Sequence, residues 1–174
     1  MTIRKILTEP DSFLRKKSEI VEKVDDSVRQ LIDDMLETMY SAPGIGLAAI
    51  QIGISKRVIV IDISKGEEEK KPLYFVNPEI IWSSKEDTTY EEGCLSVPGQ
   101  FAEIDRPDKC HVKYLDYYGN SKELKAEGLL ATCIQHEIDH LEGVLFIDYL
   151  SKLKKSLITK KLSKQKKALE RIVV

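Results

Sequence analysis

Residues 129–141 read Leu-Leu-Ala-Thr-Cys-Ile-Gln-His-Glu-Ile-Asp-His-Leu, and this stretch determines the expected fold. Apolar residues recur in it at helical spacing, and Gly143 is expected to end the helix. One side of the helix carries Leu129, Cys133, His136, Glu137 and His140, a second carries Leu130, Ile134, Ile138 and Leu141, and a narrow polar stripe carries Gln135, Asp139 and Glu142. We therefore expect a mostly buried helix. Ionisable groups on its buried side are costly unless they are paired or bound to a metal.

Residues 136–140, His-Glu-Ile-Asp-His, form an HExxH motif. Two imidazoles four residues apart project from one helix face and can share a metal ion, while the glutamate between them can reach a water on that ion. Two histidines in ordinary hydrogen bonds are the alternative interpretation. Because the helix is otherwise apolar, the pattern favours the metal.

A catalytic metal site needs a third protein ligand and one open position. Phe146 stands where a metzincin would carry its third histidine, and the glutamate beyond the motif's own turn is Glu170, deep in the tail. Cys133 lies seven residues before His140, about 10.5 Å along the helix, so we interpret it as part of a pocket wall. Cys94 lies among glycines and prolines in residues 91–99, where irregular backbone can aim a thiol into a cleft. A small buried apolar role is the alternative for Cys94.

The segments around this helix predict an α+β fold. Residues 28–39 repeat apolar side chains at helical spacing after possible N-caps at 25–27, and Pro43-Gly44 is expected to end that helix. Residues 57–63, 73–76, 80–82, 110–118 and 122–126 are typical of strands, with Asn77-Pro78 separating two of them. No strand–helix–strand alternation occurs, so we expect antiparallel or mixed sheets packed around the HExxH-bearing helix, with N-terminal and C-terminal helices. The 174 residues are expected to form a single catalytic domain, 1–174.

Composition excludes several classes of protein. With 42% hydrophobic and 32% charged residues, the chain is neither disordered nor a coiled-coil rod. Apolar runs fall well short of the roughly 18 residues of a membrane span, so no membrane association is expected. The three cysteines show no CxxC spacing and are expected to be reduced. Without a signal-peptide pattern the protein is expected in the bacterial cytoplasm, although an organellar protein that has lost its transit peptide would look the same.

Two stretches carry unusual charge. Residues 64–71 form a charge run, interpreted as a solvated loop. Residues from about 151 to 174 form a tail with nine basic residues and one acid, Glu170. Leu153, Leu157, Leu162, Leu169 and Ile172 could give this tail an apolar stripe, so we expect a third helix.

Residues 44–51, Gly-Ile-Gly-Leu-Ala-Ala-Ile-Gln, match the dinucleotide-binding pattern GxGxxG/A in residue types but not in structural context. That pattern follows a strand and opens a helix, whereas here a helix precedes it and a strand follows.

Taken together, GIGLAAIQ (44–51), EGCLS (92–96) and QHEIDH (135–140) resemble, in order and spacing, the three signature motifs of peptide deformylases. The similarity extends over most of the chain, and the basic tail resembles that of bacterial members with an extended terminal helix.

This resemblance implies a function and a site. A deformylase would remove the N-formyl group from the terminal formyl-methionine of new polypeptides and release formate. The resemblance implies Cys94, His136 and His140 as metal ligands with a water in the fourth position, and Glu137 as general acid and base. It implies Gln51 and the backbone N–H of Leu95 as the oxyanion hole. It implies that the peptide groove and methionine pocket are lined by Ile45, Gly46, Gly93, Leu129 and Cys133.

Further expectations concern cofactor and partners. The ligand set suits both iron and zinc. We expect one divalent ion per chain, with Fe²⁺ as the native metal and Zn²⁺, Ni²⁺ or Co²⁺ as ions that purified protein can carry. Arg106 matches an arginine that braces the motif around Glu92, while Phe101 stands where some members carry an arginine. The protein is expected to be a monomer, and the resemblance implies that the basic tail docks on the ribosome. A solvated amphipathic helix packed on the domain is the alternative for the tail. The alternatives are a zinc metallopeptidase and an RNA-binding module with a structural metal site.

Overall fold

The computed structural model describes residues 1–66 and 68–172. Its helices are α1 (Asp26–Ser41), α2 (Gly128–Leu141) and α3 (Lys152–Ile172), with short 3₁₀ turns η1 (Ser12–Arg15), η2 (Ala49–Ile52) and η3 (Phe146–Tyr149). Its strands are β1 (Gly46–Ala48), β2 (Val58–Ile61), β3 (Leu73–Ser83), β4 (Asp87–Cys94), β5 (Val97–Pro107), β6 (Lys109–Leu115) and β7 (Ser121–Glu127). Glu67, from the charge run, and residues 173–174 of the tail lie outside the described residues.

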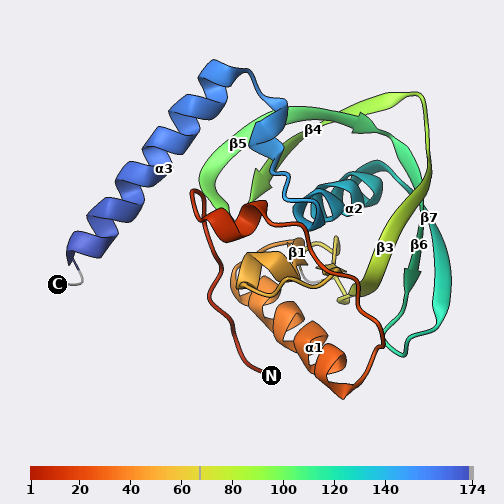
Figure 1. Ribbon diagram of the computed structural model, residues 1–174. Helices are drawn as coiled ribbons and strands as arrows, with labels where there is room; N and C mark the ends of the chain where they lie inside the picture. Colours follow the sequence, from red (N-terminus) through yellow and green to blue (C-terminus); the bar gives the residue numbers. More distant parts are fainter. Residues whose placement is uncertain (67, 173–174) are drawn as a thin grey trace.

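Two antiparallel sheets enclose α2. Five strands form one sheet in the order β1-β2-β3-β6-β7, and β4 and β5 form a separate hairpin. In Figure 1 the hairpin curves over one side of α2 while the large sheet lies on the other side. The predicted α+β class is therefore confirmed, with the HExxH helix at its centre.

Strand β2 shows why the layers stack in this way, since all four of its residues are buried. Side chains alternate across a strand. Val58 and Val60 join the cluster that packs on α1, while Ile59 and Ile61 join the cluster that packs on α2. The two helices thus cover opposite faces of the large sheet.

Strand β3 differs from the sequence prediction at Asn77 and Pro78. These residues do not separate two strands, because β3 continues from Leu73 to Ser83 with a shift in register between Val76 and Glu79. Asn77 has a positive φ of 50°, and its side-chain amide holds Val21 through both the backbone N–H and the carbonyl, at 2.8 Å each. The strand therefore continues through a bulge that also anchors the N-terminal segment.

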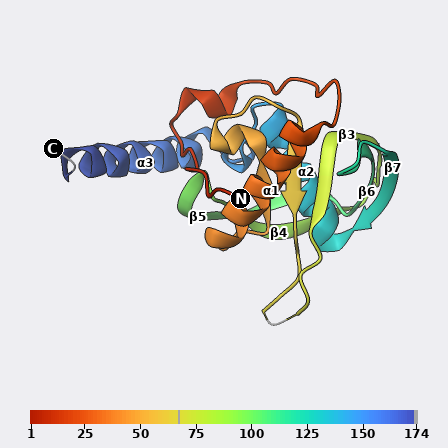
Figure 2. The same ribbon diagram turned by 90° about the horizontal axis from the view of Figure 1, so that it is seen from below.

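The predicted third helix is present as α3, but its apolar stripe is not covered along its length. Only Leu162 is buried, in a small cluster with β5 and η3, whereas Leu153, Leu157, Leu169 and Ile172 are exposed. Figures 1 and 2 both show α3 projecting away from the body of the molecule. Within the described residues, no helix combines the length and apolar character needed to cross a bilayer.

Candidate metal centre

Helix α2 presents both histidines of the HExxH motif to one site. His136 and His140 lie one turn apart with ring centroids 5.1 Å from each other, and both are buried. The helix ends where expected, since Gly143 adopts a φ of 75° and lies so close to the Arg15 carbonyl that a side chain would not fit. Gln135 belongs to the polar stripe of this helix, but it does not face solvent. It is buried, and its Nε2 donates to the Pro107 carbonyl at 2.9 Å.

The β4–β5 hairpin brings Cys94 to the same place. Cys94 is the last residue of β4, and its register with β5 shifts immediately after Gly93. The segment 91–99 was expected to be irregular, but most of it belongs to this hairpin. The Cys94 Sγ lies 3.2 Å from Nε2 of His140, and one ligand atom from each of Cys94, His136 and His140 lies within 4.8 Å of the others.

The donor set suits a transition-metal ion. One sulfur and two imidazole nitrogens are typical ligands of Zn²⁺ and Fe²⁺. Burial and the neighbouring His136 hold the pKa of His140 well below its ordinary value, which favours the neutral ring that binds metals. Among the residues that the structure describes, this is the cluster of cysteine, histidine and acidic side chains with the spacing of a metal site.

A charged network fixes the orientation of His136. Its Nδ1 lies 2.8 Å from Oε2 of Glu92, and Arg106 donates two hydrogen bonds to that carboxylate, at 2.6 and 3.1 Å. Burial raises the pKa of Glu92, but the hydrogen bonds from His136 and Arg106 outweigh it, so the net pKa is lowered. Arg106 also reaches Asp139 at 2.8 Å, and Asp139 accepts a bond from the Tyr149 hydroxyl at 2.7 Å. With Nδ1 of His136 held in this way, Nε2 is the ring nitrogen left available for a metal ion.

Gln51 is oriented toward the same centre. Its Oε1 accepts the Ala48 backbone N–H at 2.9 Å, while its Nε2 donates to the Ser96 hydroxyl at 3.0 Å and lies 3.6 Å from the Cys94 sulfur. Because the carbonyl end is already engaged, the amide N–H₂ is the end that faces the centre.

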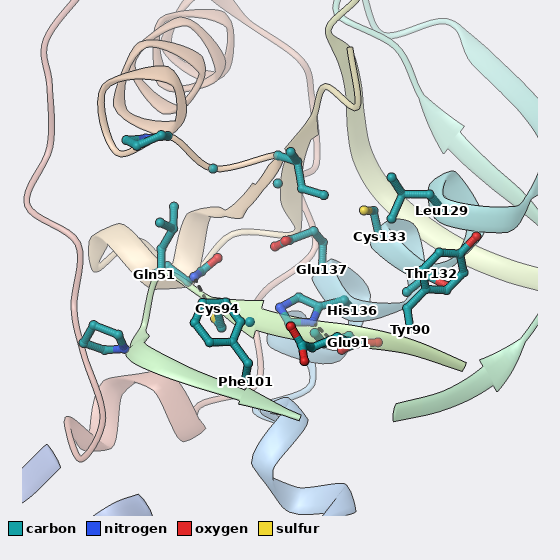
Figure 3. Close-up of a pocket in the computed structure, with 18 of the residues that line it drawn as sticks. Gln51, Tyr90, Glu91, Cys94, Phe101, Leu129, Thr132, Cys133, His136 and Glu137 are labelled. Atoms are coloured by element: carbon teal, nitrogen blue, oxygen red, sulfur yellow. Dashed lines mark hydrogen bonds and ion pairs between the residues drawn. The ribbon is translucent and has the colours of Figure 1, made fainter. Parts of the chain in front are cut away.

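A cavity of about 460 Å³ opens onto these groups. It is lined by Pro43, Gly44, Ile45, Gly46 and Gln51, by Tyr90, Glu91, Glu92, Gly93, Cys94, Leu95, Pro98, Gly99 and Phe101, and by Leu129, Thr132, Cys133, His136 and Glu137. Figure 3 shows Glu137 and Cys133 reaching into it from α2, with Phe101 on the side of the hairpin. Burial raises the pKa of Glu137 to about 7, and its Oε2 is buried without a hydrogen-bond partner.

The comparisons with known proteins agree with this geometry. The family model described as polypeptide deformylase matches residues 3–156. A peptide deformylase of Pelagibacter ubique is 66% identical over the whole of both chains, and one of Phenylobacterium zucineum is 60% identical over 97% of this chain and 99% of its own. The chain belongs to the peptide deformylase family.

Solved deformylases share the fold. The crystal structure from Ehrlichia chaffeensis superposes with a TM-score of 0.90 at 45% identity, covering 95% of this chain and 97% of that one. The same organism's enzyme in complex with actinonin gives a TM-score of 0.89 at 48% identity, with coverage of 95% and 98%. The resemblance stated from the three motifs is therefore confirmed. Like its family, this deformylase is a metal-dependent hydrolase that removes the N-formyl group from nascent peptides.

The structure gathers the residues that the resemblance implied for the deformylase site. All of them line the cavity except His140, which lies beside Cys94. Sequence reasoning did not single out Tyr90, Thr132, Ser96, Asp139 or Tyr149. No local pattern marked Asp139 or Tyr149, because both act through Arg106, which is distant from them in sequence.

Proposed function

We propose that Cys94, His136 and His140 hold the divalent ion on which deformylation depends. The observation that carries this proposal is the approach of these three donors beside a cavity that Cys94 and His136 line, next to a buried carboxylate that makes no hydrogen bond through Oε2. When bound, the ion would supply Lewis-acid polarisation of the formyl carbonyl and of the attacking water. Fe²⁺ is proposed as the native ion, because a thiolate with two imidazoles suits this softer cation, and Zn²⁺, Ni²⁺ or Co²⁺ also fit the donors.

Glu137 is proposed as the general acid and base. It lies between the two histidines in sequence yet points into the cavity, close to Gly46, and belongs to neither the ligand cluster nor the Glu92 network. From this position its carboxylate can accept a proton from the attacking water and return it to the nitrogen of the leaving amine.

The negative charge that develops on the formyl oxygen needs donors. The Gln51 amide is already aimed at the centre by its bond to Ala48, and the Leu95 backbone follows Cys94 directly. We assign Gln51 and the Leu95 N–H to this role. Loss of one such donor typically costs about 10²–10³ in rate.

The peptide is proposed to bind as a strand between two sheet edges. β1 is an outermost strand of the large sheet and β4 pairs only with β5, so each strand offers an unpaired edge. Both strands line the cavity, through Gly46 and Gly93. Ile45 precedes the β1 edge and contributes to the same wall. The methionine side chain would then enter the part of the cavity lined by Leu129 and Cys133.

Release of formate tests these assignments together. Metal-stripped protein should release formate from a formyl-methionyl peptide only after Fe²⁺, Zn²⁺, Ni²⁺ or Co²⁺ is resupplied, with Fe²⁺ under anaerobic conditions giving the fastest turnover. Activity that persists in metal-free protein would contradict the proposal.

Docking of α3 on the ribosome is the proposed role of the tail. Its basic residues project from the body on a helix whose outer face is exposed, which suits contact with phosphate groups of RNA. Co-sedimentation with ribosomes should weaken steeply with salt and disappear when the chain is truncated at residue 151. We also propose that the protein is a monomer of one catalytic domain in the bacterial cytoplasm, and sedimentation equilibrium should give a mass close to 19.8 kDa.

A further inference from the structure

The β4–β5 hairpin has two different faces. Side chains alternate across each strand. Glu92, Ile104 and Arg106 are buried on the face toward α2, whereas Phe101 belongs to the opposite, outer face. Phe101 pairs with Gly93 across the hairpin, so the two residues share that outer face.

The Phe101 ring lies across Gly93. A Cβ built on Gly93 would lie 2.6 Å from Cδ1 of Phe101 and closer still to Cε1, so the ring occupies the space that a side chain at position 93 would take. The ring thereby extends from β5 over the outer face of β4 and lines the cavity, as Figure 3 shows. The side chain nevertheless remains 65% exposed. The hairpin thus presents a large apolar surface at the edge where the peptide strand is proposed to bind.

The alternation of side chains in the peptide determines which residue meets this surface. In the proposed path the methionine side chain points inward, toward Leu129 and Cys133 on α2. The next side chain of an extended peptide points the opposite way, to the outer face shared by Gly93 and Phe101.

We infer that Phe101 is a specificity-determining residue that favours a large apolar side chain at the second position of the nascent chain. Such a side chain buries apolar surface against the ring, whereas glycine leaves the ring in water. This inference rests on the proposed peptide path. Because the ring contacts the second side chain equally in the ground state and the transition state, the contact acts through KM rather than kcat.

The test compares formyl-Met-Leu and formyl-Met-Gly peptides with otherwise identical sequences. The wild-type enzyme should favour the leucine peptide in kcat/KM by about tenfold, equivalent to about 1.4 kcal/mol. Phe101→Ala should bring the ratio close to one through a rise in KM for the leucine peptide. Phe101→Tyr keeps the ring and should preserve the ratio. Tyr118→Ala is the matched control, because Tyr118 is 75% exposed in the turn between β6 and β7 and does not line the cavity.

Several outcomes would overturn the inference: no preference in the wild-type enzyme, an unchanged ratio in Phe101→Ala, or an equal loss on both peptides. Failure of the wild-type metalloenzyme to release formate from either peptide would instead refute the proposed function, and the inference with it.

Discussion

Replacing Gly46 by alanine should slow the deformylase without removing its metal ion. A Cβ at Gly46 would lie 2.9 Å from Cδ and 3.0 Å from Cγ of Glu137, and closer still to Oε1. Ordinary contacts between carbon atoms are about 3.5–4.0 Å. The carboxylate must therefore move by roughly 0.5–1 Å, and a displacement of that size can cost about 10²-fold in rate.

The assay for this prediction is steady-state formate release, combined with elemental analysis. Gly46→Ala should lower kcat about 10²-fold and still carry one ion per chain, because the side chain nearest to the new Cβ is that of Glu137, which is not a proposed ligand. In a Glu137→Ala background the same change should have little further effect on kcat, since the group it displaces is gone. A variant with wild-type kcat would refute the reasoning that a Cβ at position 46 displaces the Glu137 carboxylate from its working position. Equal losses in both backgrounds would show that Gly46 acts by another route.

Three further predictions concern the ligands, their support and acid stability. Cys94→Ala should lose the ion on elemental analysis while Cys133→Ala retains it; an ion retained without Cys94 would contradict the ligand assignment. Glu92→Gln should weaken metal affinity about 10–100-fold, because it weakens the network that orients His136, and competition with a chelator measures this; unchanged affinity would argue against a positioning role. Burial raises the pKa of Asp34, but hydrogen bonds from Arg4, Thr2 and Gln30 outweigh it and lower the pKa below its ordinary value. The stability from Asp34 is therefore present above its unfolded pKa of about 3.9 and is lost as the pH falls through its lower folded pKa. In Asp34→Asn the melting temperature should therefore fall less steeply below about pH 4 than in the wild type. The same steep fall in both proteins would contradict this prediction.

The buried position of α2 was predictable from the pattern of its own residues. Apolar side chains on two sides of residues 129–141 predict that the helix is buried. Two histidines and a glutamate on such a helix are costly to bury unless they are paired or bind a metal ion, so the sequence also indicated a metal site. The same logic identified β2, whose residues are apolar on both faces because α1 and α2 cover both.

The β4–β5 hairpin was not predictable in this way. The one buried residue of β4 is Glu92, which serves the histidine network rather than an apolar core. Hydrophobic alternation is therefore missing where the strand supports the site. The burial of Gln135 was likewise not predictable, because it depends on the Pro107 carbonyl, which accepts a hydrogen bond from the side-chain amide. Asn77 similarly indicated a break between two strands, whereas its side-chain amide stabilises a bulge within the single strand β3.

The contact between Cys94 and the histidines joins parts of the chain that no local pattern connects. Only the combination of three motifs, through a family resemblance, indicated that they meet. The structure places the Cys94 sulfur 3.2 Å from His140, across 46 positions of sequence.

X-ray absorption at the metal edge of the purified, active enzyme tests the central claim most directly. If Cys94, His136 and His140 hold the ion, the spectrum of the active enzyme loaded with Zn²⁺ should contain one sulfur at about 2.3 Å and two imidazole nitrogens at about 2.0–2.1 Å, and Cys94→Ala should lack the sulfur contribution. A spectrum of the active wild-type enzyme with only nitrogen and oxygen neighbours would contradict the account.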